Sequence, residues 1–60
     1  MESYLKKLVT NRKKVVITDV NDCTWNGIIK YFDGIGIVLQ SEEGGNVMFP
    51  FTGIASVQED

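Results

Sequence analysis

The hydrophobic residues of this chain change their spacing once, near Val15. Before that point the apolar residues recur at helical spacing and share one side of a helix: Tyr4, Leu5, Leu8 and Val9. After it, β-branched residues run in short stretches bounded by turn residues, which is typical of strands. The chain therefore predicts one short helix followed by β-structure. It has no stretch of the roughly 18 apolar residues that a membrane span needs.

The helix is expected over about residues 3–11. Ser3 can cap its start, because its hydroxyl can accept a hydrogen bond from a backbone N–H that the first turn leaves free. Asn11 suits its end, and Lys6 and Lys7 face away from the apolar side. A helix this short is not stable alone, so its apolar side must pack against the strands.

Five strands are expected, separated by turn residues. They cover residues 15–20, 25–32, 35–40, 47–49 and 54–57. We interpret Gly27 as a glycine inside the second strand, because a hairpin turn at Asn26-Gly27 would leave only about two or three residues before it. Pro50 has no N–H to donate, so it lies at a sheet edge or a break. This order predicts a mostly β fold, a strongly bent five-stranded antiparallel barrel over about residues 15–58.

A single domain of 60 residues buries little surface, and this one has few means of cross-linking itself. One cysteine, Cys23, excludes an internal disulfide, and the absence of histidine excludes a zinc site of the Cys/His type. We therefore expect oligomerisation to supply stability. No secretory signal precedes the helix, so a cytoplasmic protein is expected, with no cofactor, no metal and no membrane partner.

The net charge of −2 conceals two oppositely charged parts. Residues 1–14 carry five basic side chains and one acidic one, a balance of +4, whereas residues 15–60 carry one lysine and seven carboxylates, a balance of −6. A basic segment of this kind can attract an anionic polymer. The simpler interpretation is that its lysines only solvate the outer side of the helix.

The chemistry of the side chains favours binding over catalysis. A nucleophile needs a base, and the sequence has no histidine, while neighbouring carboxylates occur only in a loop and at the C-terminal tail. We therefore expect no enzyme. Six aromatic residues are present, and exposed aromatics beside basic residues can hold single-stranded nucleic acid. By alternation, Phe32, Phe49 and Phe51 are expected in the core and Trp25 at the surface.

Several of these features together resemble Hfq, the bacterial RNA chaperone of the Sm-like superfamily. After the short helix the matching motifs are Val15-x-Ile17, Gly27-x-Ile29-x-x-Phe32-Asp33 and Ile54-x-Ser56. The resemblance covers about residues 4–57 and implies the bent barrel, with the helix laid across one open end. It also implies a ring, usually of about six copies, in which the fourth strand of one subunit pairs with the fifth strand of the next.

The same resemblance implies three RNA-binding surfaces. On the pore face the matching positions hold Gly34, Ile35, Phe51 and Thr52, which replace an aromatic residue and a Lys-His pair of the family pattern. On the opposite face they hold Thr18, Trp25 and Asn26, with Asp22 in place of a turn glycine. The outer rim keeps its basic character through Lys6, Lys7, Arg12, Lys13 and Lys14.

The expected function is that of a ring-forming RNA-binding protein, acting as an RNA chaperone in post-transcriptional regulation and the stress response. Its expected partners are single-stranded RNA and further copies of itself, as a homohexamer. An alternative is an assembly or protein-interaction module on the same barrel, with little or no RNA binding. The lost Lys-His pair and the acidic pI of about 4.9 favour this alternative. A third possibility is a monomeric SH3-like domain.

Overall fold

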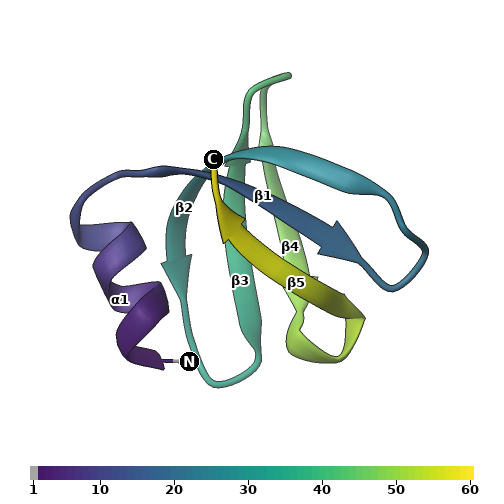
Figure 1. The fold of residues 1–60 in the computed structure, drawn as a ribbon, viewed down its shortest axis with the longest axis horizontal. Helices are drawn as coiled ribbons and strands as arrows, with labels where there is room; N and C mark the ends of the chain where they lie inside the picture. The colour runs from purple at the N-terminus through teal and green to yellow at the C-terminus, as the bar shows by residue number, and fades with distance from the viewer. Residues whose placement is uncertain (1) are drawn as a thin grey trace.

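The computed structural model describes residues 2–60, with side chains from Ser3 onward, and over this range it contains one α-helix and one five-stranded antiparallel sheet (Figure 1). In chain order the elements are α1 (Glu2–Thr10), β1 (Lys14–Asp19), β2 (Thr24–Phe32), β3 (Gly36–Ser41), β4 (Asn46–Pro50), the 3₁₀ turn η1 (Phe51–Gly53) and β5 (Ile54–Glu59). The prediction of a mostly β fold with an N-terminal helix and five strands is confirmed. No helix among the described residues is both long and apolar enough to cross a membrane.

The strands lie side by side in the order β4-β3-β2-β1-β5, and every neighbouring pair is antiparallel. The last two strands of the chain therefore form the two edges of the sheet. The register shifts between Ile29 and Tyr31, where β2 meets β3, and between Thr18 and Asp19, where β1 meets β5. Such bulges increase the bend of a sheet, and Figure 1 shows strands that curve around a common interior.

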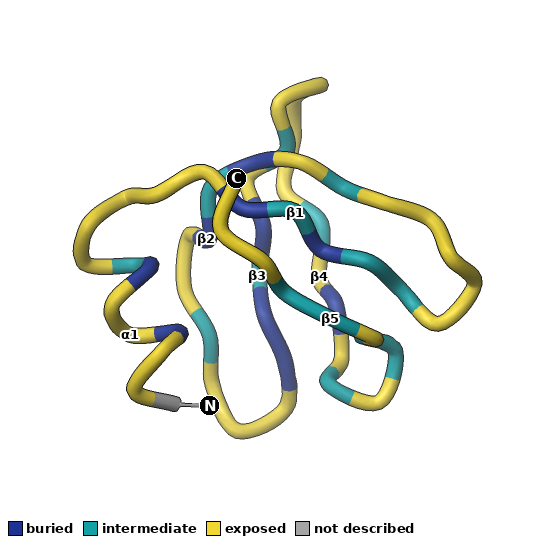
Figure 2. The backbone as a smooth tube through the Cα atoms, viewed as in Figure 1, coloured by how far each residue is buried: buried dark blue, intermediate teal, exposed yellow. Residues whose placement is uncertain are grey.

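Alternate strand residues face this interior and form the core together with the apolar side of α1 (Figure 2). The buried side chains are Leu5, Leu8, Val15, Ile17, Ile29, Ile37, Leu39 and Phe49. The expectation that Phe49 belongs to the core is confirmed. Phe32 and Phe51 are only half-buried and pack at its margin. Trp25, expected at the surface, is also half-buried against this core.

The start of α1 differs from the prediction. The helix begins at Glu2, so Ser3 lies inside its first turn and is not the residue that caps it. Tyr4, expected on the apolar side, is 41% exposed, and the helix makes its contact with the core through Leu5 and Leu8. The expected end is confirmed to within one residue, because the helix stops at Thr10.

A left-handed residue, Arg12 with φ 49°, turns the chain from α1 into β1. The Arg12 N–H donates to the Val9 carbonyl at 3.2 Å, and the Lys13 N–H donates to the Leu8 carbonyl at 3.1 Å. These two bonds are the Schellman arrangement, in which glycine is the usual left-handed residue. The turn places Arg12, Lys13 and Lys14 together between the helix and the first strand.

Gly27 lies inside β2, which confirms its interpretation as a strand glycine. A Cβ atom at this position would collide with the carbonyl oxygen of Gln40 on β3. The close approach of the two strands therefore requires a residue without a side chain. Pro50 ends β4, an edge strand, as expected of a residue that cannot donate to a ladder.

Candidate nucleic-acid interface

Five exposed basic residues form the basic segment of the chain. They are Lys6 and Lys7 on α1, Arg12 in the turn after it, Lys13, and Lys14 at the start of β1. Lys6 and Lys7 are exposed because Leu5 and Leu8 take the side of the helix that faces the core. The basic residues predicted for the rim are thus all exposed and lie within residues 6–14, from the helix to the start of β1.

Two of these five residues already have acidic neighbours. The Lys13 ammonium lies 4.0 Å from a Glu59 carboxylate oxygen, and the Lys14 ammonium lies 3.5 Å from a Glu42 carboxylate oxygen. Both pairs are exposed to solvent, where an ion pair contributes only about 0–1 kcal/mol. A phosphate group can therefore displace either carboxylate at small cost, but these carboxylates lower the positive potential around Lys13 and Lys14.

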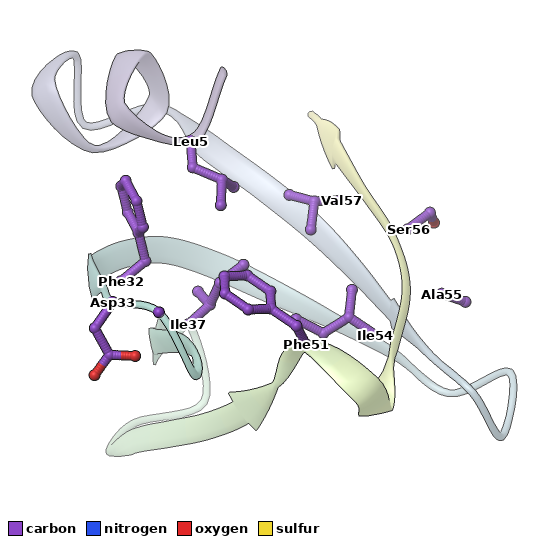
Figure 3. Close-up of a pocket in the computed structure, with 10 residues that line it drawn as sticks. Leu5, Phe32, Asp33, Ile37, Phe51, Ile54, Ala55, Ser56 and Val57 are labelled. Carbon is purple, nitrogen blue, oxygen red and sulfur yellow. The ribbon is translucent and has the colours of Figure 1, made fainter. Parts of the chain in front are cut away.

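A half-open pocket of about 480 Å³ lies between α1, the turn from β2 to β3, and β5 (Figure 3). Its lining residues are Leu5, Phe32, Asp33, Gly34, Ile37, Phe51, Ile54, Ala55, Ser56 and Val57. Figure 3 shows Leu5, Phe51 and Val57 pointing toward one another across the pocket, which we call the β5 pocket. Most of its surface is apolar, and no basic residue lines it.

The residues predicted for the pore face are only partly brought together by this pocket. Gly34 and Phe51 line it, whereas Thr52 is exposed and Ile35, 70% exposed, is outside the lining. The turn that holds Gly34 and Ile35 is nevertheless joined to the segment of Phe51 and Thr52, because the Phe51 N–H donates to the Ile35 carbonyl at 2.9 Å. Asp33 also lines this pocket; it was predicted as part of a motif but not as a site residue, although its place beside Gly34 in a turn could have indicated it.

Asp33 organises the turn from β2 to β3. Its carboxylate accepts hydrogen bonds from the Ile35 N–H at 2.8 Å and the Gly36 N–H at 3.0 Å. These two bonds, the Ile35 bond first, hold the pKa of Asp33 below its usual value. The β5 pocket therefore has a negatively charged carboxylate at its margin.

The residues predicted for the opposite face do not all lie on one side of the sheet. Thr18 pairs with Thr24 on β2 and with Ser56 on β5, so three hydroxyl side chains form a row on the outer surface of the sheet. Asn26 lies in the next row, where it pairs with Val16. This outer surface, turned away from the core, is called the convex face below.

Trp25 points to the other side of the sheet from Thr18 and Asn26. Its indole N–H donates to an Asp19 carboxylate oxygen at 3.2 Å, and its ring meets the edge of Phe49 with centroids 5.5 Å apart. Trp25 therefore closes one end of the core and is not part of the convex face. Alternation along β2 indicates this direction of the Trp25 side chain, because its neighbours Thr24 and Asn26 are both exposed on the other side of the strand.

Asp19 fixes the turn that joins β1 and β2. Besides the Trp25 indole, its carboxylate accepts hydrogen bonds from the Asn21 N–H at 2.8 Å and the Cys23 N–H at 3.0 Å. The bond from Cys23 is the largest cause that holds the pKa of Asp19 below its usual value. Asp22 in this turn has φ 64°, a conformation that favours the glycine of the family pattern.

No protein-family model matches this sequence, and a search of curated proteins also finds no match. The solved structures that are similar to this chain include two that match over nearly its whole length. The crystal structure of the pleiotropic translational regulator Hfq has a TM-score of 0.90 at 19% sequence identity, over 95% of this chain and 93% of that one. An Hfq protein from Anabaena sp. has a TM-score of 0.87 at 17% identity, over 98% and 93%. The chain therefore has an Hfq-like Sm fold.

Proposed function

We propose, from this Hfq-like Sm fold, that the chain assembles into a ring of about six copies that binds single-stranded RNA through the basic segment. The ring acts in the cytoplasm as an RNA chaperone in post-transcriptional regulation. The similar structure with a TM-score of 0.90 is that of a translational regulator, and this is consistent with the proposal. The observation that carries it is the run of five exposed basic side chains on a fold whose two edge strands each pair on one side only.

The strand order supports the ring. β4 and β5 each pair on one side only, so both present backbone N–H and C=O groups at a sheet edge. Pairing β4 of one copy with β5 of the next joins two different surfaces, and such contacts form a ring when the rotation closes. The β5 pocket lies beside one of these edges, and its apolar lining would gain cover from a neighbouring copy.

A ring also explains how a weak binding site becomes sufficient. Every copy contributes one basic segment, so one RNA strand can contact several segments at once, and each further contact forms at a high effective concentration. The partial neutralisation of Lys13 and Lys14 by Glu59 and Glu42 is then tolerable, because few phosphate contacts per copy are needed.

Two other surfaces are proposed as additional RNA contacts. On the pore side they involve Gly34, Ile35, Phe51 and Thr52, which offer apolar area and one hydroxyl group. On the convex face they involve Thr18 and Asn26, which offer hydrogen bonds to base edges. Trp25, also predicted for that face, is proposed to act only indirectly, by fixing the turn between β1 and β2 through Asp19.

Titration of oligouridine and oligoadenine at two or more salt concentrations tests RNA binding by the basic segment. Simultaneous Arg12→Ala, Lys13→Ala and Lys14→Ala substitution should weaken binding by roughly 10-fold or more, since the slope of log K against log salt is about −0.7 per phosphate neutralised on single strands. The same triple variant should flatten that slope by about 2 for each basic segment that contacts the RNA. The uncharged double variant Thr10→Ala/Asn11→Ala, on the same stretch, should bind as the unsubstituted protein does.

The alternative function, a protein-interaction module without RNA binding, is favoured by one feature of the site. The β5 pocket is apolar with a carboxylate at its margin, which suits a peptide side chain better than a phosphate. The same titration separates the two functions. Absence of binding at low salt to both oligonucleotides would support the interaction module, and unchanged binding by the triple variant would overturn the assignment to the basic segment.

A further inference from the structure

An exposed aromatic ring and an exposed thioether lie in one row across the convex face. Tyr31 on β2 pairs with Val38 on β3, and Val38 pairs with Met48 on β4. Their side chains share the convex face because the alternate residues of β3, Ile37 and Leu39, are buried in the core. Tyr31 is 53% exposed and Met48 is 47% exposed, so the row is a strip of apolar surface open to solvent.

Ammonium and carboxamide side chains lie next to this strip. Lys30 is exposed beside Tyr31, in the stretch where the register between β2 and β3 shifts. The next row across the sheet begins at Lys14 and continues through Ile28 to the amide side chains of Gln40 and Asn46. The convex face at this point thus combines an aromatic ring, the Lys30 ammonium, the Lys14 ammonium in its exposed pair with Glu42, and two carboxamides.

This combination matches the parts of a nucleotide. An aromatic ring offers a stacking surface to any base, an ammonium group attracts a phosphate, and carboxamides can hydrogen-bond to base edges. A protein partner would use the apolar strip but would have less use for the two ammonium groups beside it. The mixture of charge and amides therefore favours a single-stranded nucleic acid as the occupant.

We propose that Tyr31 is a base-stacking residue for single-stranded RNA on the convex face, with Lys30 holding the adjoining phosphate; this inference rests on the proposed RNA-binding function. The strand order supports it, since β2 is the middle strand and lies two strands from either edge. A ring closed through β4 and β5 leaves Tyr31 uncovered. The contact adds to the basic segment a site that recognises bases.

Three substitutions at Tyr31 separate stacking from apolar contact. Tyr31→Phe keeps the ring, Tyr31→Leu keeps apolar area without a ring, and Tyr31→Ala removes both. Because stacking of one base contributes roughly 1–3 kcal/mol, Tyr31→Ala and Tyr31→Leu should weaken oligonucleotide binding by roughly 5- to 100-fold, while Tyr31→Phe stays within about twofold. The salt slope should be the same in all three variants, because no phosphate contact is lost.

A second readout does not depend on affinity. An oligonucleotide that carries 2-aminopurine should lose fluorescence on binding to the unsubstituted protein and to Tyr31→Phe, and should lose less on binding to Tyr31→Leu under saturating conditions. Thermal unfolding of each variant checks the fold, and substitution of an exposed side chain such as Tyr31 should change the thermal midpoint little.

The outcomes distinguish this inference from the function on which it rests. If the unsubstituted protein shows no salt-dependent RNA binding, both the proposed function and the stacking role of Tyr31 are wrong. If it binds RNA and Tyr31→Ala binds equally well, only the stacking role is wrong. If Tyr31→Leu retains full affinity while Tyr31→Ala loses it, the strip is an apolar docking surface and the proposal is also overturned.

Discussion

At the scale of single residues, Asp19 shows how one charge supports the fold. Its pKa is held low by hydrogen bonds from the Cys23 N–H, the Trp25 indole and the Asn21 N–H. A carboxyl group whose pKa is lower in the folded than in the unfolded chain stabilises the fold fully above the unfolded value, here near 3.8. That stabilisation is lost as the pH falls through the folded pKa.

The first prediction follows from this sign. Asp19→Asn should lower the free energy of unfolding at neutral pH and should reduce the further loss of stability between about pH 5 and pH 2. Urea unfolding followed by Trp25 fluorescence at both ends of this range measures the change. Asp33 contributes in the same direction, so the double variant with Asp33→Asn should have the flattest pH profile. An Asp19→Asn profile parallel to that of the unsubstituted protein would contradict the role of the ionised carboxylate.

The sequence could identify such residues only in part. Aspartate before glycine is a common turn signal, and the strands predicted over 25–32 and 35–40 leave Asp33-Gly34 as the turn that the structure shows. The bond between Asp19 and Trp25 joins residues on two strands, and only the register of β1 against β2 brings them together. The direction of the Trp25 side chain could therefore not be fixed before the pairing of the strands was known.

At the scale of secondary-structure elements, the junction of β2 and β3 is a close backbone contact that a single substitution can test. Gly27→Ala would force a Cβ atom against the backbone of Gln40, and backbone cannot move aside as a flexible side chain can. We expect a loss of roughly 1–3 kcal/mol in the free energy of unfolding. Gly34→Ala is the matched control, because a Cβ atom there meets nothing within 4 Å, and it should change stability by less than about 0.5 kcal/mol.

Thermal unfolding of the two alanine variants measures this difference in stability. The midpoint of Gly27→Ala should be lower than that of the unsubstituted protein by at least about 4 °C. Equal midpoints for both variants would show that the strands can separate at Gly27 without cost.

Five strands and the place of Gly27 were predictable, because alternation and turn residues are local signals. The start of α1 was not, since Ser3 is a good capping residue that lies inside the helix, and the left-handed Arg12 carries no glycine signal.

At the scale of the whole molecule, the strand order leaves the chain with two unpaired edges and an open apolar pocket. The order β4-β3-β2-β1-β5 could not be obtained from local patterns, because it depends on which strand ends meet after the sheet bends. The resemblance to Hfq implied only that the fourth and fifth strands have free edges, and the structure confirms the Hfq-like fold. Apart from the resemblance, the sequence predicts assembly through its small size, since a 60-residue chain without a disulfide gains stability from neighbours.

The last prediction concerns this assembly. Native mass measurement in non-denaturing salt should give about six or seven times the 6.7 kDa of one chain, and the thermal midpoint should rise with protein concentration. Ala55→Lys, an exposed position on the edge strand β5, should shift the mass toward the monomer, because a lysine at a sheet edge opposes pairing. Thr24→Lys adds the same charge at an exposed position of the inner strand β2 and should leave the mass unchanged.

The two variants separate an edge contact from a general effect of charge. A monomeric mass for the unsubstituted chain at micromolar concentration would refute the ring and leave RNA binding to one basic segment per molecule. A ring that persists in Ala55→Lys but dissociates in Thr24→Lys would place the contact between copies on the convex face. In that case the convex face would take part in assembly, and the mass of each Tyr31 variant would have to be measured before its RNA binding is interpreted.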